Sequence, residues 1–269
     1  GTFLLNLMSS PGSGKTTTAM KIAEALRGMG ISSQSLAMDD YFRTVNPRTA
    51  PRTPEGDIDF ESPACLDMDL LGKHLNALAR GEEIHLPRYN FVTRVQSGPI
   101  GRPMRLGKDE VVVCEGIHAL NDDIAAYCPD AFRLYISARS VVVDGDGQEI
   151  FKGTWMRLLR RLVRDSNFRG TPAAATLDMW ANVRRGEKRF ISPFKERANL
   201  MFDSSFPCEV SIMKNFAAPL LAAVPEGAER YAEIRSILPA LERFETIDPT
   251  LLAPESMLRE FIGGGVYSY

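Results

Sequence analysis

The feature that most constrains this chain is a glycine-containing loop close to its start. Residues 9–16 read Ser-Ser-Pro-Gly-Ser-Gly-Lys-Thr and follow the apolar, β-prone run Thr2–Met8. The next segment, Thr17–Met29, has apolar side chains at helical spacing. A Gly-Lys-Thr sequence between a strand and a helix is typical of the Walker A loop, which binds nucleotide phosphates. This context favours a phosphate loop over the alternative of a simple turn between two elements.

The chemistry of such a loop assigns roles to its residues. Small side chains let successive backbone N–H groups turn toward phosphate oxygens, and the helix N-terminus adds positive potential. We expect Lys15 to reach the outer phosphates and the Thr16 hydroxyl to coordinate Mg²⁺. The loop departs from the usual pattern at Ser9, where a first glycine is common. The residues predicted to bind ATP and Mg²⁺ through this loop are Gly12, Ser13, Gly14, Lys15, Thr16 and Thr17.

Composition argues against several classes of protein. The 269 residues carry a formal net charge of -2, whereas nucleic-acid-binding proteins usually show a basic excess. The 4 cysteines are scattered and match neither a zinc-site spacing nor a disulfide framework. No apolar run approaches the roughly 18 residues that span a bilayer. We therefore expect a cytoplasmic protein with a small-molecule substrate and no nucleic-acid or membrane partner, and we leave homo-oligomerisation open.

The rest of the sequence alternates short apolar strands with helices. The expected strands are Ser35–Met38, Glu110–Cys114 and Phe132–Ile136, and the expected helices are Leu66–Arg80 and Trp155–Asp165. This alternation favours an α/β fold of the P-loop NTPase type, with a mostly parallel sheet flanked by helices. Prolines and glycines predict a long surface loop at Arg43–Asp59 and a turn or hairpin at Ser97–Leu106.

Two strand ends supply the acidic residues that phosphate chemistry needs. A buried apolar strand ends at Glu115, whose carboxylate is predicted to hold Mg²⁺ together with Thr16. Asp39 and Asp40 follow the strand Ser35–Met38, and ligands of parallel α/β sheets bind at the carboxyl ends of strands. Asp39 is the predicted base that orients an acceptor hydroxyl and takes its proton, with Asp40 as the alternative. Helix capping by either aspartate is the competing interpretation.

Four arginines share one face of the expected helix Trp155–Asp165, because they fall at positions i, i+3, i+4 and i+7. They are Arg157, Arg160, Arg161 and Arg164. The other side carries Leu158, Leu159, Leu162 and Val163. Neighbouring like charges repel one another, and an anion would relieve that repulsion. The pattern predicts arginines that stabilise phosphate charge, and a solvated basic face is the alternative.

Six further stretches form a set that covers almost the whole chain. They are Asp39–Phe42, Asp59–Pro63, Leu86–Phe91, Cys114–Leu120, Arg160–Asp165 continuing to Arg169–Gly170, and Arg259–Gly264. Together with the phosphate loop they resemble the uridine kinase and phosphoribulokinase family of P-loop kinases. The likeness is greatest to long bacterial nucleoside kinases that often carry an N-terminal TGS-like domain. A sequence that begins at Gly1 without methionine is compatible with such a domain upstream.

The resemblance implies transfer of the ATP γ-phosphate to a nucleoside 5′-hydroxyl, with Asp39 as the base. It implies that Glu61 and Arg157 lie near the ribose hydroxyls, and that Tyr89 and Phe91 form walls of the base pocket. Tyr41, beside the acidic pair, is included in the predicted substrate-binding set. Core packing is the alternative for the aromatic residues.

The resemblance also implies how the chain is organised. Residues 1–269 are expected to form a single kinase domain with a mobile lid at about 154–190 and a helical C-terminal extension at about 217–269. The lid would carry Arg160 and Arg164 as catalytic groups, and Arg161 and Arg169 as nucleotide-binding groups.

Two departures bear on the substrate. Uridine kinases have a pyrimidine-reading histidine five residues after the tyrosine, where this chain has Arg94, and Trp155 stands where the long kinases usually have aspartate. Arg94 is thus a predicted specificity residue, suited to a carboxylate or phosphate. A kinase of the same fold for a sugar, polyol or acid remains the alternative. A GTPase metallochaperone has a similar loop but needs an Asn-Lys-x-Asp motif, which is absent here, and a regulatory protein without turnover is a third alternative.

Overall fold

The structure is a computed structural model that describes residues 3–91, 93–98 and 101–268. Its contacts divide the chain into two compact units, which are described separately. The first, called the sheet unit, comprises the residues up to Ser9, Thr18–Tyr135 and Arg184–Phe202. The second, called the helical unit, comprises Ser10–Thr17, Ile136–Val183 and the residues from Asp203 onward.

A five-stranded sheet of order β11-β8-β1-β7-β2 organises the sheet unit. Its strands are β1 (Phe3–Ser9), β2 (Ser33–Ala37), β7 (Val111–Glu115), β8 (Phe132–Ser137) and β11 (Leu200–Asp203). β7 pairs in parallel with both β1 and β2. Every residue of β7 is buried, as expected for a strand in the middle of a parallel sheet. The predicted α/β fold class, with a parallel sheet flanked by helices, is confirmed.

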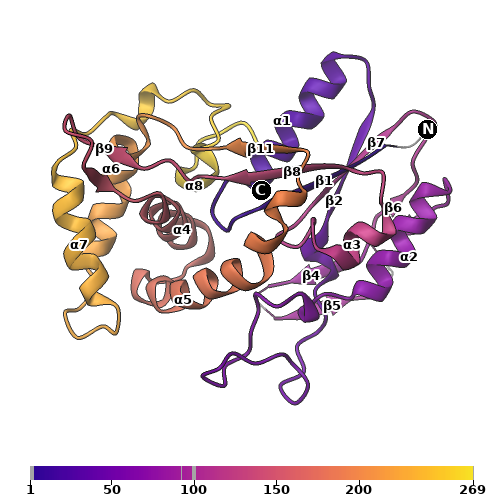
Figure 1. Ribbon diagram of the computed structural model, residues 1–269, viewed down its shortest axis with the longest axis horizontal. Helices are drawn as coiled ribbons and strands as arrows, with labels where there is room; N and C mark the ends of the chain where they lie inside the picture. Colours follow the sequence, from indigo (N-terminus) through magenta and orange to yellow (C-terminus); the bar gives the residue numbers. More distant parts are fainter. Residues whose placement is uncertain (1–2, 92, 99–100, 269) are drawn as a thin grey trace. The chain divides into compact units, whose positions relative to one another are not determined.

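Helices of the sheet unit pack on this sheet. They are α1 (Lys15–Gly28), whose first three residues belong to the helical unit, α2 (Met68–Ala79) and α3 (Asp122–Tyr127). The Asp67 side chain caps α2 by accepting a hydrogen bond from the Leu70 N–H at 3.2 Å. Leu71, Leu75 and Leu78 of α2 are fully buried in one cluster with residues of β2 and β7. Figure 1 shows α2 and α3 side by side.

Short elements complete the sheet unit. They are the pair β3 (Ile84–His85) and β6 (Pro103–Met104), the hairpin β4 (Arg88–Asn90) and β5 (Val95–Ser97), and the helical turns η1 (Met38–Tyr41), η2 (Pro63–Cys65), η3 (Glu187–Ile191) and η4 (Ser192–Arg197). The predicted loop Arg43–Asp59 has no helix or strand beyond one isolated bridge between Arg52 and Ile58. The stretch predicted as a turn or hairpin at Ser97–Leu106 contains β6.

The helical unit has a hydrophobic core of its own. Its elements are the hairpin β9 (Val142–Val143) and β10 (Glu149–Phe151), α4 (Gly153–Arg169), most of α5 (Ala173–Gly186), α6 (Glu209–Ala222), α7 (Tyr231–Glu242), η5 (Pro249–Leu251) and α8 (Arg259–Ile262). Leu158 and Leu162 of α4 are buried with Met213 and Leu221 of α6 and Ile237 of α7. The helices of the C-terminal region therefore share one hydrophobic core with α4. Figure 1 shows α6 and α7 side by side.

Helix α4 differs from its predicted pattern. It begins before Trp155 and ends at Gly170, which adopts φ 60, a left-handed conformation that favours glycine. Arg157 and Arg160 are 4% and 0% exposed, so the alternative of a solvated basic face is wrong for both. In the part of the chain that the structure describes, no helix is long and apolar enough to cross a membrane.

A close contact between two helices makes the first testable prediction. A Cβ atom on Gly72 of α2 would lie 2.3 Å from the ring of Tyr127 in α3. Gly72→Ala should therefore lower the free energy of unfolding by about 1–3 kcal/mol, the usual cost of overpacking. Gly28→Ala is the matched control, because nothing lies within 4 Å of its Cβ position at the end of α1. It should leave stability unchanged or raise it by up to about 1 kcal/mol.

Urea unfolding of the two variants measures this difference. Equal effects of the two substitutions would contradict the contact between α2 and α3.

Candidate active site

The phosphate loop in the helical unit depends on two glycines. Gly12 and Gly14 have φ angles of 77 and 79, in the region that side chains disfavour. A Cβ on Gly12 would lie 3.1 Å from the backbone oxygen of Arg157, and one on Gly14 would lie 2.0 Å from the sulfur of Met257. The backbone conformation therefore favours glycine at both positions. Lys15 opens α1 directly after the loop.

The carbonyl oxygens of the loop bind side chains of the helical unit. The Arg157 guanidinium donates to Pro11 O at 3.4 Å, and Arg160 donates to Gly12 O at 3.3 Å. The third acceptor, Ser13 O, is bound by the Ser204 hydroxyl at 2.7 Å. Side chains of α4 and of the segment that precedes α6 thus bind three successive carbonyl groups of the loop.

Arg160 has protein partners for its whole guanidinium. It forms a fully buried ion pair with Glu209, in which Nε and Nη2 donate to the two carboxylate oxygens. Nη2 also donates to Ser204 O at 2.7 Å, and Nη1 donates to Gly12 O and to the Ser204 hydroxyl. These bonds use all the N–H groups that an arginine has. The predicted catalytic role of Arg160 at the phosphates is therefore corrected: no donor remains for a phosphate oxygen.

The other arginines of α4 gather around one buried carboxylate. Arg161 Nε lies 3.4 Å from Asp165 Oδ2. Arg164 Nη2 and Arg169 Nη1 lie 2.8 Å and 3.6 Å from Asp165 Oδ1. Three guanidinium groups of α4 thus lie around one buried carboxylate.

A carboxylate of the protein lies at the N-terminus of α1. The Thr17 hydroxyl donates to Glu260 Oε2 at 2.6 Å, and the Thr17 N–H donates to the same oxygen at 3.3 Å. Glu260 belongs to α8, in the segment Arg259–Gly264, to which the sequence analysis gave no role. The first turn of a helix stabilises negative charge, and here Glu260 supplies it.

The sheet unit contributes the predicted acidic residues. Glu115, the last residue of β7, is 8% exposed and pairs in register with Leu7 of β1 and Ala37 of β2. Asp39 follows β2 in η1. Glu115 thus stands at the carboxyl end of β7, and Asp39 follows the carboxyl end of β2, the neighbour of β7 in the sheet. Strand β1, which lies between β7 and β8, leads into the phosphate loop.

The carboxylate of Glu115 fits a magnesium site of the nucleotide-dependent kind. Among the described residues, no group of three or more histidines, cysteines, aspartates or glutamates could hold a metal ion. Mg²⁺ in such sites is held by one or two protein oxygens, with phosphates and water as the other ligands. A single carboxylate such as that of Glu115 can therefore serve in a site of this kind, and its role as a Mg²⁺ ligand stays a prediction.

The two adjacent aspartates have different surroundings. Asp40 Oδ1 accepts a hydrogen bond from the Tyr89 N–H at 3.3 Å, and burial raises the pKa of Asp40. Among the described residues, no backbone N–H donates a hydrogen bond to the Asp39 carboxylate. Asp40 thus anchors the hairpin β4–β5, and Asp39 is the better candidate for a base.

Tyr41 belongs to the core and not to a substrate pocket. It is 0% exposed, and its hydroxyl forms a hydrogen bond with His74 Nδ1 at 2.8 Å. Burial raises the pKa of Tyr41. Its predicted contact with the substrate is therefore wrong, because no surface of the ring remains accessible.

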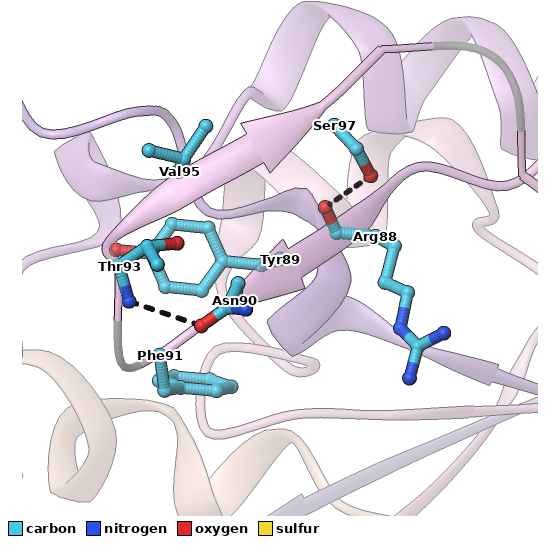
Figure 2. Close-up of a pocket in the computed structure, with 7 residues that line it drawn as sticks. All are labelled: Arg88, Tyr89, Asn90, Phe91, Thr93, Val95 and Ser97. Atoms are coloured by element: carbon cyan, nitrogen blue, oxygen red, sulfur yellow. Dashed lines mark hydrogen bonds between the residues drawn. The ribbon is translucent and has the colours of Figure 1, made fainter.

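The hairpin β4–β5 forms an open pocket of about 580 Å³. Figure 2 shows its lining residues, which are Arg88, Tyr89, Asn90, Phe91, Thr93, Val95 and Ser97. The rings of Tyr89 and Phe91 meet edge to face at 4.9 Å between centroids. Tyr89 is mostly buried, whereas Phe91 is 58% exposed. The structure thus brings together both predicted pocket aromatics, on a hairpin held by a hydrogen bond from the Ser97 hydroxyl to Arg88 O at 2.9 Å.

Arg94 does not line this pocket. Its guanidinium lies over the Phe60 ring at 4.9 Å, and the residue is exposed. The backbone has φ 57, and the Arg94 N–H and C=O groups bind Asn90 O and Val45 N. Arg94, predicted as a specificity residue, thus lies outside the hairpin pocket in this structure, where a cation–π contact at the surface holds its side chain.

Other polar residues of the sheet unit gather near Glu61. A Cβ on Gly186 would lie 2.3 Å from Glu61 Cβ, and Arg185 lies 3.2 Å from the buried carboxylate of Asp59. His118 is 1% exposed, and burial lowers its pKa to about 4, so this imidazole is neutral at pH 7. Asp59 and His118 lie in two of the segments that resemble the kinase family, Asp59–Pro63 and Cys114–Leu120. Nothing in the sequence pattern distinguished Arg185.

The contact of Glu260 with Thr17 gives a testable prediction. If ATP phosphates use the N-terminus of α1, the negative charge of Glu260 opposes their binding. Glu260→Gln keeps an oxygen acceptor but removes the charge, and it should lower the Kd for ATP by roughly 3–10-fold, measured by calorimetry. Glu255→Gln, at an exposed position five residues before Glu260, is the matched control and should change little. A Kd that rises in Glu260→Gln would contradict the prediction.

Comparison with known proteins identifies the family. A model of the phosphoribulokinase / uridine kinase family matches residues 4–210. Uridine kinases from Deinococcus deserti and Halobacterium salinarum are 30% and 28% identical over 200 residues, which cover 74% of this chain and 86% and 79% of those proteins. A solved structure from Bacillus stearothermophilus, described as a possible uridine kinase, has a TM-score of 0.51 at 19% identity and covers 76% of this chain and 89% of that one. The chain belongs to the phosphoribulokinase / uridine kinase family of P-loop kinases.

Proposed function

We propose that this protein transfers the γ-phosphate of ATP to the 5′-hydroxyl of a nucleoside that resembles uridine or cytidine. The observation that carries the proposal is the position of Asp39, which follows β2 while β7, beside it in the sheet, ends at Glu115. In parallel α/β sheets this edge binds the ligands. The relatives described as uridine kinases support a nucleoside as the acceptor.

In the proposed reaction Asp39 accepts the proton of the acceptor hydroxyl as the hydroxyl oxygen attacks the γ-phosphorus. ADP is the leaving group, and the phosphate ester is the product. Lys15 and the loop amides bind the phosphates of ATP. When bound, Mg²⁺ would neutralise charge on the phosphate oxygens, with Thr16 and Glu115 as its protein ligands.

The arginines around Asp165 suit the remaining phosphate charge. Phosphoryl transfer depends on positioning and on electrostatic stabilisation of the transferring group. Arg161, Arg164 and Arg169 are the proposed sources of that stabilisation, because they lie on α4, whose Arg157 and Arg160 donate to the carbonyl groups of the phosphate loop. Arg157 donates to the backbone of the phosphate loop, and its place near the ribose hydroxyls stays a prediction.

The acceptor pocket is proposed to lie at the hairpin β4–β5. Phe91 and Tyr89 offer aromatic surface to a planar base, and Glu61 remains the proposed partner of the ribose hydroxyls. The polar side chains of Arg88, Asn90 and Thr93 in the same pocket support a second candidate, an acceptor with additional oxygen atoms such as a sugar or polyol.

Single substitutions test the proposed base. Asp39→Asn should lower kcat by roughly 10²–10⁴-fold, as is usual for a positioned acid–base group, while the Kd for ATP stays unchanged. Asp40→Asn is the matched neighbour and should affect stability more than kcat, because Asp40 holds the Tyr89 N–H. Lys15→Ala should abolish both turnover and ATP binding. If Asp40→Asn has the larger defect in kcat, the base is Asp40.

A panel of acceptors tests the pocket. ADP release should be fastest with uridine or cytidine and slower with sugars and polyols. Phe91→Ala should raise the KM for the nucleoside by roughly tenfold through lost ring contact, and Arg94→Ala should leave the ranking of acceptors unchanged. A preference for sugars or polyols that survives Phe91→Ala would favour the second candidate.

A further inference from the structure

We propose that Glu209 is a positioning residue for the phosphate loop and acts through Arg160 and Ser204. The inference rests on the proposed function in one respect, namely that the loop binds ATP. It assigns a role to a glutamate that no sequence pattern distinguished, and it gives Arg160 a task other than contact with phosphate.

The contacts form a continuous chain from Glu209 to the loop. Glu209 is 0% exposed, and its carboxylate binds Arg160 Nε and Nη2 side by side. This geometry fixes the plane of the guanidinium. Arg160 Nη1 then donates to Gly12 O at 3.3 Å and to the Ser204 hydroxyl at 3.4 Å.

The ion pair of Arg160 and Glu209 also fixes the orientation of Ser204. Its backbone oxygen accepts from Arg160 Nη2 at 2.7 Å, and its hydroxyl oxygen accepts from Nη1. A serine hydroxyl has only one proton, and here it is donated to Ser13 O at 2.7 Å. Glu209 Oε2 also accepts from the Phe206 N–H at 3.2 Å, so the turn that carries Ser204 is held by the same carboxylate.

These bonds determine where the loop amides point. In a trans peptide the C=O and the following N–H lie in one plane and point in opposite directions. A hydrogen bond that holds Ser13 O toward Ser204 therefore directs the Gly14 N–H away from Ser204. In the same way, Arg160 helps to fix the peptide between Gly12 and Ser13, whose N–H donates to Ser10 O at 3.2 Å. Glycines at φ 77 and 79 would otherwise allow these peptides to rotate.

The charges of Arg160 and Glu209 favour a role in positioning the phosphate loop over a role in stability alone. A buried ion pair contributes little net stability, because desolvation offsets the attraction between the charges. An apolar pair would fill the same space in a helical core such as this one. Arginine and glutamate instead supply donors aimed at backbone oxygens, which apolar side chains cannot supply.

Three variants test the proposal by calorimetric titration of ATP in the absence of acceptor. Ser204→Ala removes only the bond to Ser13 O and should raise the Kd for ATP by roughly 2–10-fold. Glu209→Gln should raise it by roughly tenfold or more. The double variant Arg160→Met with Glu209→Leu removes both buried charges and should stay folded. Its loss of ATP affinity should be at least as large as that of Glu209→Gln. In all three the KM for the acceptor should change by less than roughly twofold.

Leu221→Ala is the matched control, because Leu221 is fully buried in α6, the helix that begins with Glu209. It should lower the Tm but leave the Kd for ATP unchanged at temperatures well below its Tm. A folded double variant with the ATP affinity of the wild type would overturn the inference, as would an equal loss of affinity in Leu221→Ala. Absence of ATP binding by the wild-type protein would instead overturn the proposed function.

Discussion

The parallel pairing of β7 with β1 and β2 is the interaction on which the candidate site depends. It places Leu7, Glu115 and Ala37 in register, so that three chain segments leave the sheet at the same edge. One segment becomes the phosphate loop, one ends in a carboxylate, and one continues into Asp39. Because β7 is buried throughout, its apolar sequence determines both the stability of the sheet and the position of the acidic residue at its end.

Much of this arrangement could be predicted from the sequence because it depends on local signals. The strand, loop and helix around Gly12 and Lys15 have strong propensities and a specific motif, and β7 is a short run of β-branched residues ahead of an acid. Tyr89 and Phe91 were expected as pocket residues only through resemblance to a family. In each case the information lies in neighbouring residues, so no long-range contact had to be known.

The errors have a common physical origin, since each involves a partner far away in the sequence. Arg160 was expected at phosphates because its spacing suggested an exposed face, but Glu209 neutralises it inside the helical core. Tyr41 was expected at the substrate, yet its hydroxyl binds His74 below the surface. Arg94 was expected in a pocket, and it lies on Phe60. Helical periodicity gives the direction of a side chain but not the group that it meets.

The buried pair of Arg160 and Glu209 also limits how this sequence can change over evolutionary time. Loss of one partner leaves a charge without its counter-ion inside the core, at a cost of about 3–5 kcal/mol. That is a large part of the roughly 5–15 kcal/mol by which a folded domain exceeds its unfolded state. Either residue replaced alone should give a protein that still folds but is less stable, whereas the fold should tolerate replacement of both. The two positions should therefore be inherited together, and they should co-vary among homologues although they lie 49 residues apart.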